Sequence, residues 1–175
     1  GGSPITGLDS DFFQMLGGGY VAGLVPVPVV WMLLMFAGFW FLLKQTVFGR
    51  HVYATGGNEE ASRLSGVKVD RVKIWVYTVS GAMSAMAGVV LTSRLNSAQP
   101  TAGTGYELDA IAAVVLGGTS LTGGRGWIFG TLMGALLIGV LNNGLNLLGV
   151  SSFYQQVIKG AVILLAVLLD RAGKK

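Results

Sequence analysis

Long apolar runs separated by polar loops dominate the chain. Apolar residues fill 25–43, 74–91, 127–148 and 153–169, without the two-residue or 3.6-residue alternation of a half-buried soluble element. Each run is about long enough to cross a hydrocarbon core of roughly 30 Å. The pattern therefore predicts an all-α integral membrane protein that forms a polytopic helix bundle.

A fifth apolar stretch, 108–116, is too short to cross as a helix at about 1.5 Å per residue. Glu107 and Asp109 lie at its start, where acids favour a helix N-terminus. Gly117 and Gly118 end it, so the chain either continues through the membrane as unwound backbone or turns back as a re-entrant segment. We expect about five membrane segments, of which this one is short or broken.

The basic residues indicate the orientation of the chain. They concentrate in the polar segment 45–73 and at the C-terminus, which carries Arg171, Lys174 and Lys175. The positive-inside rule predicts that both are cytoplasmic. A re-entrant 108–116 would put the C-terminal cluster outside, so the charges favour a crossing, after which the loop with Arg125 is also cytoplasmic.

Small residues recur at four-residue steps in two of the predicted spans. This spacing allows two helices to approach closely in lipid. We therefore expect close packing along one face of each of these spans, formed by Gly81, Ser84, Ala85 and Gly88 in the first and by Gly126, Gly130 and Gly134 in the second.

The composition argues against several kinds of chemistry. Cysteine is absent and His51 is the only histidine, so neither a thiolate nor a histidine-based metal site is expected. The glycine-rich stretch 117–126 lacks the GxxxxGK[ST] pattern of a P-loop, and we interpret its glycines as tight turns and close packing. We expect no cofactor and no nucleic-acid partner. Lys159 lies in the last apolar run, and we expect its long stem to carry the ammonium group to the lipid headgroups. We also expect it to have no acid partner in a span, and this argues against an intramembrane enzyme, which needs paired catalytic residues.

The polar segment 45–73 contains the signals of a helix of two turns. Asn58 is suited to the N-cap and Gly66 to the C-terminal stop. Such a helix is too short to be stable alone in water, so it has to dock. Ala61 and Leu64, three residues apart, form its apolar face. The pattern leaves three surfaces on which this helix could dock: a second subunit, the lipid headgroups or the chain's own helix bundle.

Three segments carry a resemblance to a known family. They are GRHVYATGGNEEASRLSG at 49–66, NSAQPTAGTGYELDAIAAVVLGGTSL at 96–121 and LNNGLNLLGVSS at 141–152. With these motifs the chain resembles ribose-type permeases of ABC transporters, in the larger group that includes branched-chain amino acid permeases. The resemblance covers nearly the whole chain and implies that residues 1–175 are the C-terminal part of such a transmembrane domain.

The resemblance implies a permease subunit in a bacterial inner membrane that imports ribose or a related monosaccharide by alternating access. Its expected partners are a second permease copy, membrane lipid, a periplasmic sugar-binding protein and an ATP-binding subunit that hydrolyses ATP, so this chain is not itself an enzyme. In such permeases a cytoplasmic loop helix couples to the ATPase. Carried over to segment 45–73, the coupling residues are Asn58, Glu59, Glu60, Ala61, Arg63, Leu64 and Ser65.

The candidate substrate pathway consists of neutral polar residues. Asn142, Asn143 and Asn146 lie near the outer end of the 127–148 span, and Gln99 and Thr101 lie in an outer loop. Neutral amides exchange hydrogen bonds with an uncharged sugar without trapping it, but they also hold helices together. An ion-coupled transporter or channel fragment is the alternative function, because broken helices such as the short third segment are typical of ion sites.

Overall fold

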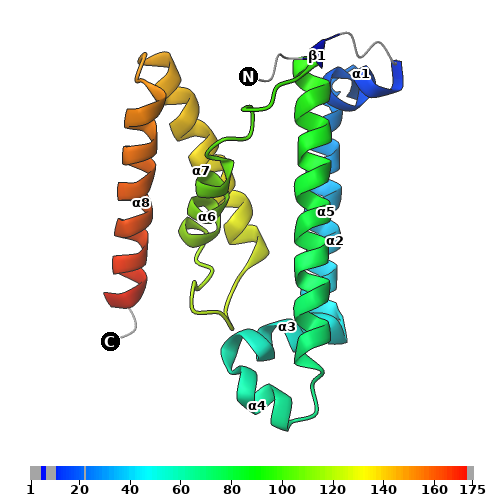
Figure 1. Cartoon of the computed structure of the whole chain (residues 1–175), viewed down its shortest axis with the longest axis vertical. Coiled ribbons are helices and arrows are strands. Elements are labelled where there is room, and N and C mark those ends of the chain that lie inside the picture. The colour runs from blue at the N-terminus through cyan, green and yellow to red at the C-terminus, as the bar shows by residue number, and fades with distance from the viewer. Residues whose placement is uncertain (1–4, 7–10, 22, 173–175) are drawn as a thin grey trace. The chain divides into compact units, whose positions relative to one another are not determined.

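The structure is a computed structural model that describes residues 5–6, 11–21 and 23–172 (Figure 1). These residues form helices and four strands of two residues each. Three of the helices are long and apolar enough to cross a membrane: α2 (Val27–Gln45), α5 (Val69–Leu95) and α7 (Ile128–Leu147). The predicted all-α polytopic membrane protein is confirmed. The chain divides into two compact units, one of residues 1–48 and 68–104 and one of residues 49–67 and 105–175.

In the first unit, α2 begins where its prolines require. Pro26 is the N-cap with an extended backbone, and Pro28 lies in the first turn, where a missing N–H costs no intrahelical hydrogen bond. Thr46 ends the helix and donates its hydroxyl to the carbonyl of Leu42 at 2.6 Å. The 19 residues of α2 extend over about 28 Å, which matches the apolar core of a bilayer.

The second long helix of this unit, α5, exceeds the predicted span at both ends. It begins at Val69 and ends at Leu95, so the charged residues Asp70 and Lys73 lie in its first turns and not in a loop. Its 27 residues correspond to about 40 Å, more than a hydrocarbon core needs. Asn96, in the left-handed conformation, terminates the helix.

Helix α1 (Asp11–Gly18) packs against the C-terminal end of α5. A Cβ on Gly17 would overlap the backbone of Arg94, so this approach requires glycine. The hydroxyl of Ser93 donates to the carbonyl of Phe13 and fixes the contact. Two short antiparallel pairs complete the unit: β1 (Ile5–Thr6) with β4 (Ser97–Ala98), and β2 (Tyr20–Val21) with β3 (Val25–Pro26).

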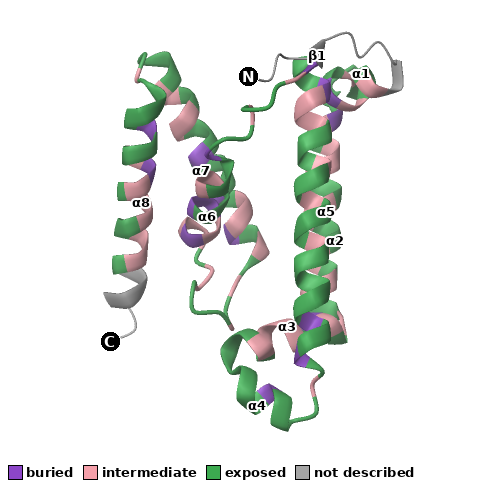
Figure 2. Ribbon diagram, viewed as in Figure 1, coloured by how far each residue is buried: buried purple, intermediate pink, exposed green. Residues whose placement is uncertain are grey.

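In the second unit, the short helix α6 (Tyr106–Leu116) packs against both α7 and α8 (Ser152–Ala172). The core consists of Ala112, Ala113 and Ile138, with Leu116 and Ile163 around it. Figure 2 shows buried positions on α6 and on parts of α7 and α8. The 11 residues of α6 extend over only about 16 Å, which confirms the prediction of a short third segment.

Glycine permits the close contact between α6 and α7. A Cβ on Gly130 would overlap the carbonyl oxygen of Gly117, and one on Gly134 would overlap that of Ala113. The predicted close packing of Gly130 and Gly134 is therefore confirmed. On α5 the same pattern gives a different result, because a Cβ on Gly81 or Gly88 would meet nothing within 4 Å. The packing predicted for that face of α5 is absent from the described part of the chain.

Candidate functional site

The polar segment 45–73 folds as two helices before α5 begins. α4 (Glu59–Leu64) is the predicted two-turn helix, and α3 (Val47–Gly57) precedes it. The sequence reading missed α3. Its residues include Gly49, Gly56 and Gly57, and glycine costs about 1 kcal/mol relative to alanine inside a helix, so local propensity did not indicate it.

Both predicted caps of α4 are confirmed. The Oδ1 atom of Asn58 accepts the backbone N–H of Ala61 at 2.9 Å. At the other end, Gly66 takes a φ of 85° and donates to the carbonyl of Arg63, and the N–H of Val67 donates to the carbonyl of Ser62. This pair of bonds is the Schellman arrangement that ends a helix at glycine.

The surface of α4 divides into a covered side and an open side. Ser62 is buried and donates its hydroxyl to the carbonyl of Asn58 at 2.8 Å. Leu64 is 85% exposed, and Ala61 is exposed as well, so the predicted apolar face is uncovered in this chain. Arg63 pairs with Glu59 at 3.4 Å, but both side chains are about half exposed and such pairs contribute little.

The glycine-rich stretch between α6 and α7 packs against α3. The hydroxyl of Tyr53 donates to the carbonyl of Gly126 at 3.2 Å. A Cβ on Gly56 would lie 2.8 Å from the backbone nitrogen of Gly124, so the two backbones touch directly. The interpretation of these glycines as tight turns and close packing is confirmed.

A buried ion pair joins α6 to α8. The Nζ atom of Lys159 lies 2.6 Å from Oδ1 of Asp109, and the two side chains are only 11% and 19% exposed. The side-chain amide of Asn142, on α7, donates to the other carboxylate oxygen of Asp109 at 2.9 Å. The predictions that Lys159 reaches the headgroups and has no acid partner in a span are therefore wrong. Lipid offers charged groups no partner, so buried charges in a membrane protein pair with each other.

A second polar contact joins α7 to α8 beside this pair. Gln155 is buried, and its side-chain amide donates both to Oδ1 of Asn146 and to the carbonyl of Val150, at 2.8 Å each. The spacing of two polar residues in the sequence indicates this contact. Gln155 and Lys159 are four residues apart in an apolar run, so they share one face of a helix and both point to a polar interior.

The structure separates the five pathway candidates. Asn142 and Asn146 lie in the contacts between α6, α7 and α8 and act there as interhelical links. Asn143, on another side of α7, is exposed. Gln99 and Thr101 are exposed in turns of the first unit, where their carbonyls accept backbone N–H groups. The five residues thus do not form one site within either unit.

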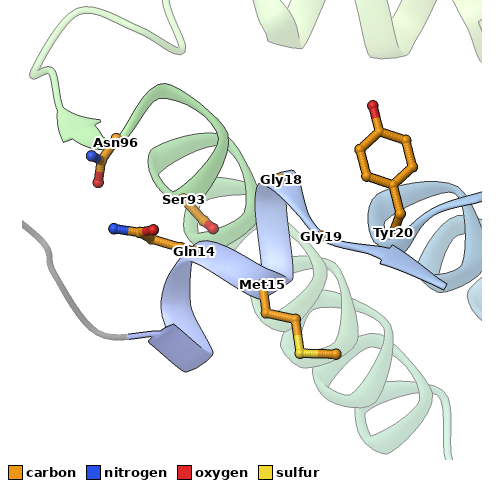
Figure 3. A pocket seen from close by; sticks show the side chains of 7 residues that line it. All are labelled: Gln14, Met15, Gly18, Gly19, Tyr20, Ser93 and Asn96. Carbon is orange, nitrogen blue, oxygen red and sulfur yellow. The ribbon is translucent and has the colours of Figure 1, made fainter. Parts of the chain in front are cut away.

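An open hollow of about 620 Å³ lies in the first unit between α1 and the end of α5 (Figure 3). Gln14 and Asn96 bring their amides to one side of it. None of the five pathway candidates lines it. Over residues 5–6, 11–21 and 23–172, no group of three or more acidic or histidine side chains is placed to hold a metal ion.

Three helices long and apolar enough to span a membrane, two short helices in a basic polar segment and a polar cluster between α6, α7 and α8 are the features of a multi-pass membrane protein. A family model described as "branched-chain amino acid transport system / permease component" matches residues 2–167. The chain belongs to this permease family.

Named relatives agree with this membership. The ribose import permease protein RbsC of Bacillus subtilis is 66% identical over 171 residues, which cover 97% of this chain and 53% of the relative. The protein of the same name in Escherichia coli K12 is 59% identical with the same coverage. The xylose transport system permease protein XylH of Escherichia coli K12 is 49% identical over 86% of this chain and 38% of the relative. No solved structure matches the chain.

The chain spans about half the length of the ribose permeases that it matches. That the matched half is the C-terminal one rests on the resemblance of its motifs and stays a prediction.

Proposed function

We propose that the chain is part of the membrane permease subunit of an ATP-driven importer of ribose or a related monosaccharide. Membership of the permease family supports this, as do relatives that are named ribose import permease and xylose transport permease. The observation that carries the proposal is α4, a helix capped at both ends whose apolar residue Leu64 is 85% exposed. A two-turn helix that presents leucine to water needs a partner surface.

The partner that we propose for α4 is a separate ATP-binding subunit. Its contact residues are Asn58, Glu59, Glu60, Ala61, Arg63, Leu64 and Ser65, of which Leu64 supplies the central apolar contact. Binding and hydrolysis of ATP in that subunit drive alternating access in the permease, which performs no covalent chemistry. A second permease copy and a periplasmic sugar-binding protein complete the proposed assembly.

We place both polar loops of the second unit on the cytoplasmic side of a bacterial inner membrane. The basic residues of segment 45–73 support this orientation, and the bond from Tyr53 to Gly126 supports a common side for the two loops. The C-terminus is proposed to lie there too. Of its basic cluster, Lys174 and Lys175 lie outside the described residues.

For the pathway, Asn143 is the strongest of the five candidates. Its side chain is exposed, and no hydrogen bond occupies its amide among the described residues, whereas Asn142 and Asn146 are already engaged. Gln99 and Thr101 stay candidates for the outer mouth. The alternative of an ion-coupled transporter or channel loses support, because the buried carboxylate of Asp109 is already neutralised by Lys159.

Loss of the ATPase contact tests the proposed function. The permease is purified with its ATP-binding subunit, and retention of that subunit is compared between wild type, Leu64→Asp and Leu64→Met. Leu64→Asp replaces the apolar contact with a charge, so we expect loss of association with an unchanged unfolding temperature of the permease. Leu64→Met keeps an apolar side chain and is expected to retain the subunit. Full association of Leu64→Asp would contradict the assignment of α4.

A further inference from the structure

At the C-terminal end of α3, the contact with the loop before α7 is backbone against backbone. Gly56 and Gly57 end α3, and Gly123 and Gly124 form the turn that faces them. A Cβ on Gly124 would lie 2.6 Å from the Cα of Gly57, and one on Gly56 would lie 2.8 Å from the nitrogen of Gly124. Side chains, which rotate, do not separate these two segments. A displacement of one backbone is therefore passed directly to the other.

Each side of this contact is itself stiff. In the loop, the N–H of Ser120 donates to the carbonyl of Arg125 at 3.0 Å, and the N–H of Gly123 donates to the carbonyl of Ser120 at 3.2 Å. Beyond the loop, the backbones of Gly117 and Gly130 lie too close together for a Cβ on either residue, so we expect α6 and α7 to move together. A push on the loop therefore reaches both helices.

On the other side, α3 and α4 are joined without a flexible linker. Asn58, the only residue between them, donates its N–H to the carbonyl of Ala54 in α3 at 3.0 Å. Its side chain accepts the N–H of Ala61 in α4. One residue thus belongs to the hydrogen-bond pattern of both helices, so α4 and α3 are expected to move together.

We propose that Tyr53 and Gly56 are positioning residues for transport, because they seat the 118–126 loop on α3 and so relay movement of the ATPase-coupling helix to α6 and α7. This inference rests on the proposed function of α4. Tyr53 contributes the bond to Gly126 at the far end of the loop, and Gly56 contributes the close backbone approach at its turn. Together they hold the loop at two points, so it follows α3 in rotation as well as in translation.

Two adjacent glycines provide a matched test. Gly56→Ala puts a methyl group 2.8 Å from the nitrogen of Gly124 and forces the backbones apart, whereas the methyl group of Gly57→Ala would lie 3.8 Å from the Cα of Gly124, an ordinary contact. Both variants add the same helix-favouring residue to the end of α3. The complete transporter in vesicles, with its ATP-binding subunit and sugar-binding protein, is assayed for subunit association, ATP hydrolysis and ribose uptake.

We expect Gly56→Ala to keep the ATP-binding subunit and to hydrolyse ATP, while ribose uptake per ATP falls about fivefold or more, the scale of typical coupling between sites. Gly57→Ala is expected to behave as wild type. Tyr53→Phe, which loses only the hydroxyl group, is expected to reduce uptake per ATP about two- to tenfold. A merely structural role would lower assembly, hydrolysis and uptake together.

The relay is wrong if Gly56→Ala and Gly57→Ala have the same uptake per ATP. If Gly56→Ala does not assemble with the ATP-binding subunit, the Tyr53→Phe variant provides the test. Uptake per ATP equal to wild type in Tyr53→Phe would then overturn the relay. Failure of the proposed function has a different signature, since the wild-type chain would then neither retain an ATP-binding subunit nor take up sugar in response to ATP.

Discussion

The two units of the chain use the same small-residue pattern in opposite ways. On α7, Gly130 and Gly134 lie against the backbone of α6. On α5, Gly81 and Gly88 meet nothing within 4 Å, and no part of the most apolar stretch of that helix is buried. Small residues at four-residue steps therefore show that a helix is able to pack closely. They do not show which helix packs against it.

The units also differ in how they treat polar groups. In the second unit, Asp109 pairs with Lys159 and accepts a hydrogen bond from the amide of Asn142, so the contact links three helices. Backbone and side-chain polar groups have no water to bond with inside lipid, so such clusters fix the register of the helices that carry them. This is how α6, too short to span, is held in place. The long helices α2 and α5 need no such cluster, since each is long enough to cross.

The largest effect is expected from breaking the ion pair of the second unit. Lys159→Met leaves the carboxylate of Asp109 buried without its cation, so we expect about 3–5 kcal/mol loss in the free energy of unfolding. The double variant Lys159→Met with Asp109→Leu removes both charges and is expected to regain most of that loss. Unfolding of purified protein in detergent measures both. Equal stability of the single variant and wild type would contradict the pair.

A smaller loss is expected at the glycine contact of α7. Gly130→Ala places a methyl group on the carbonyl oxygen of Gly117 and is expected to cost about 1–3 kcal/mol, as overpacking does. Gly139→Ala on the same helix meets nothing within 4 Å and serves as the control. Thermal unfolding of both variants measures the difference. If the two variants have equal midpoints, the packing described between α6 and α7 is wrong.

Loss of the cap of α4 is expected to cost about 1 kcal/mol. Asn58→Ala removes the acceptor for the N–H of Ala61, while Asn58→Ser keeps one and serves as the control. Hydrogen exchange of residues 59–64 reports this local change, and Asn58→Ala should exchange about five to ten times faster than the control. Unchanged exchange would show that the rest of the loop, and not the cap, holds α4.

The smallest effect is expected on α5. Gly81→Ala and Gly88→Ala fill open space, so stability should stay constant or rise by up to about 1 kcal/mol, since alanine favours a helix. The same unfolding assay as for Gly130→Ala gives the comparison between the units. A loss as large as that of Gly130→Ala would remove the distinction drawn between α5 and α7.

Local signals in the sequence predicted local structure. The caps at Asn58 and Gly66 and the short apolar stretch of α6 each depend on neighbouring residues, and the structure has them as predicted. Helix α3 was missed because its glycines lower its propensity. It is instead held at the contact with the 118–126 loop, which lies far along the chain.

Pairings between distant residues could not be predicted from local patterns. From the sequence, Lys159 was expected to reach the headgroups. Its partner Asp109 belongs to another helix, and its position suggested only the start of a helix next to an exposed loop. For the candidate site, the sequence predicted which residues cap α4 and which form its open face. The engagement of Asn142 and Asn146 depends on how α6, α7 and α8 pack, which one sequence does not give.

Labelling from the two sides of the membrane tests the central claim, that segment 45–73 and the 118–126 loop share the cytoplasmic side. The chain has no cysteine, so Ser65→Cys and Thr122→Cys each give one exposed thiol, and Thr101→Cys gives an outer control. With a membrane-impermeant thiol reagent, the account predicts that Ser65→Cys and Thr122→Cys react only in inside-out vesicles and Thr101→Cys only in right-side-out vesicles. Reaction of Ser65→Cys or Thr122→Cys in right-side-out vesicles would contradict it.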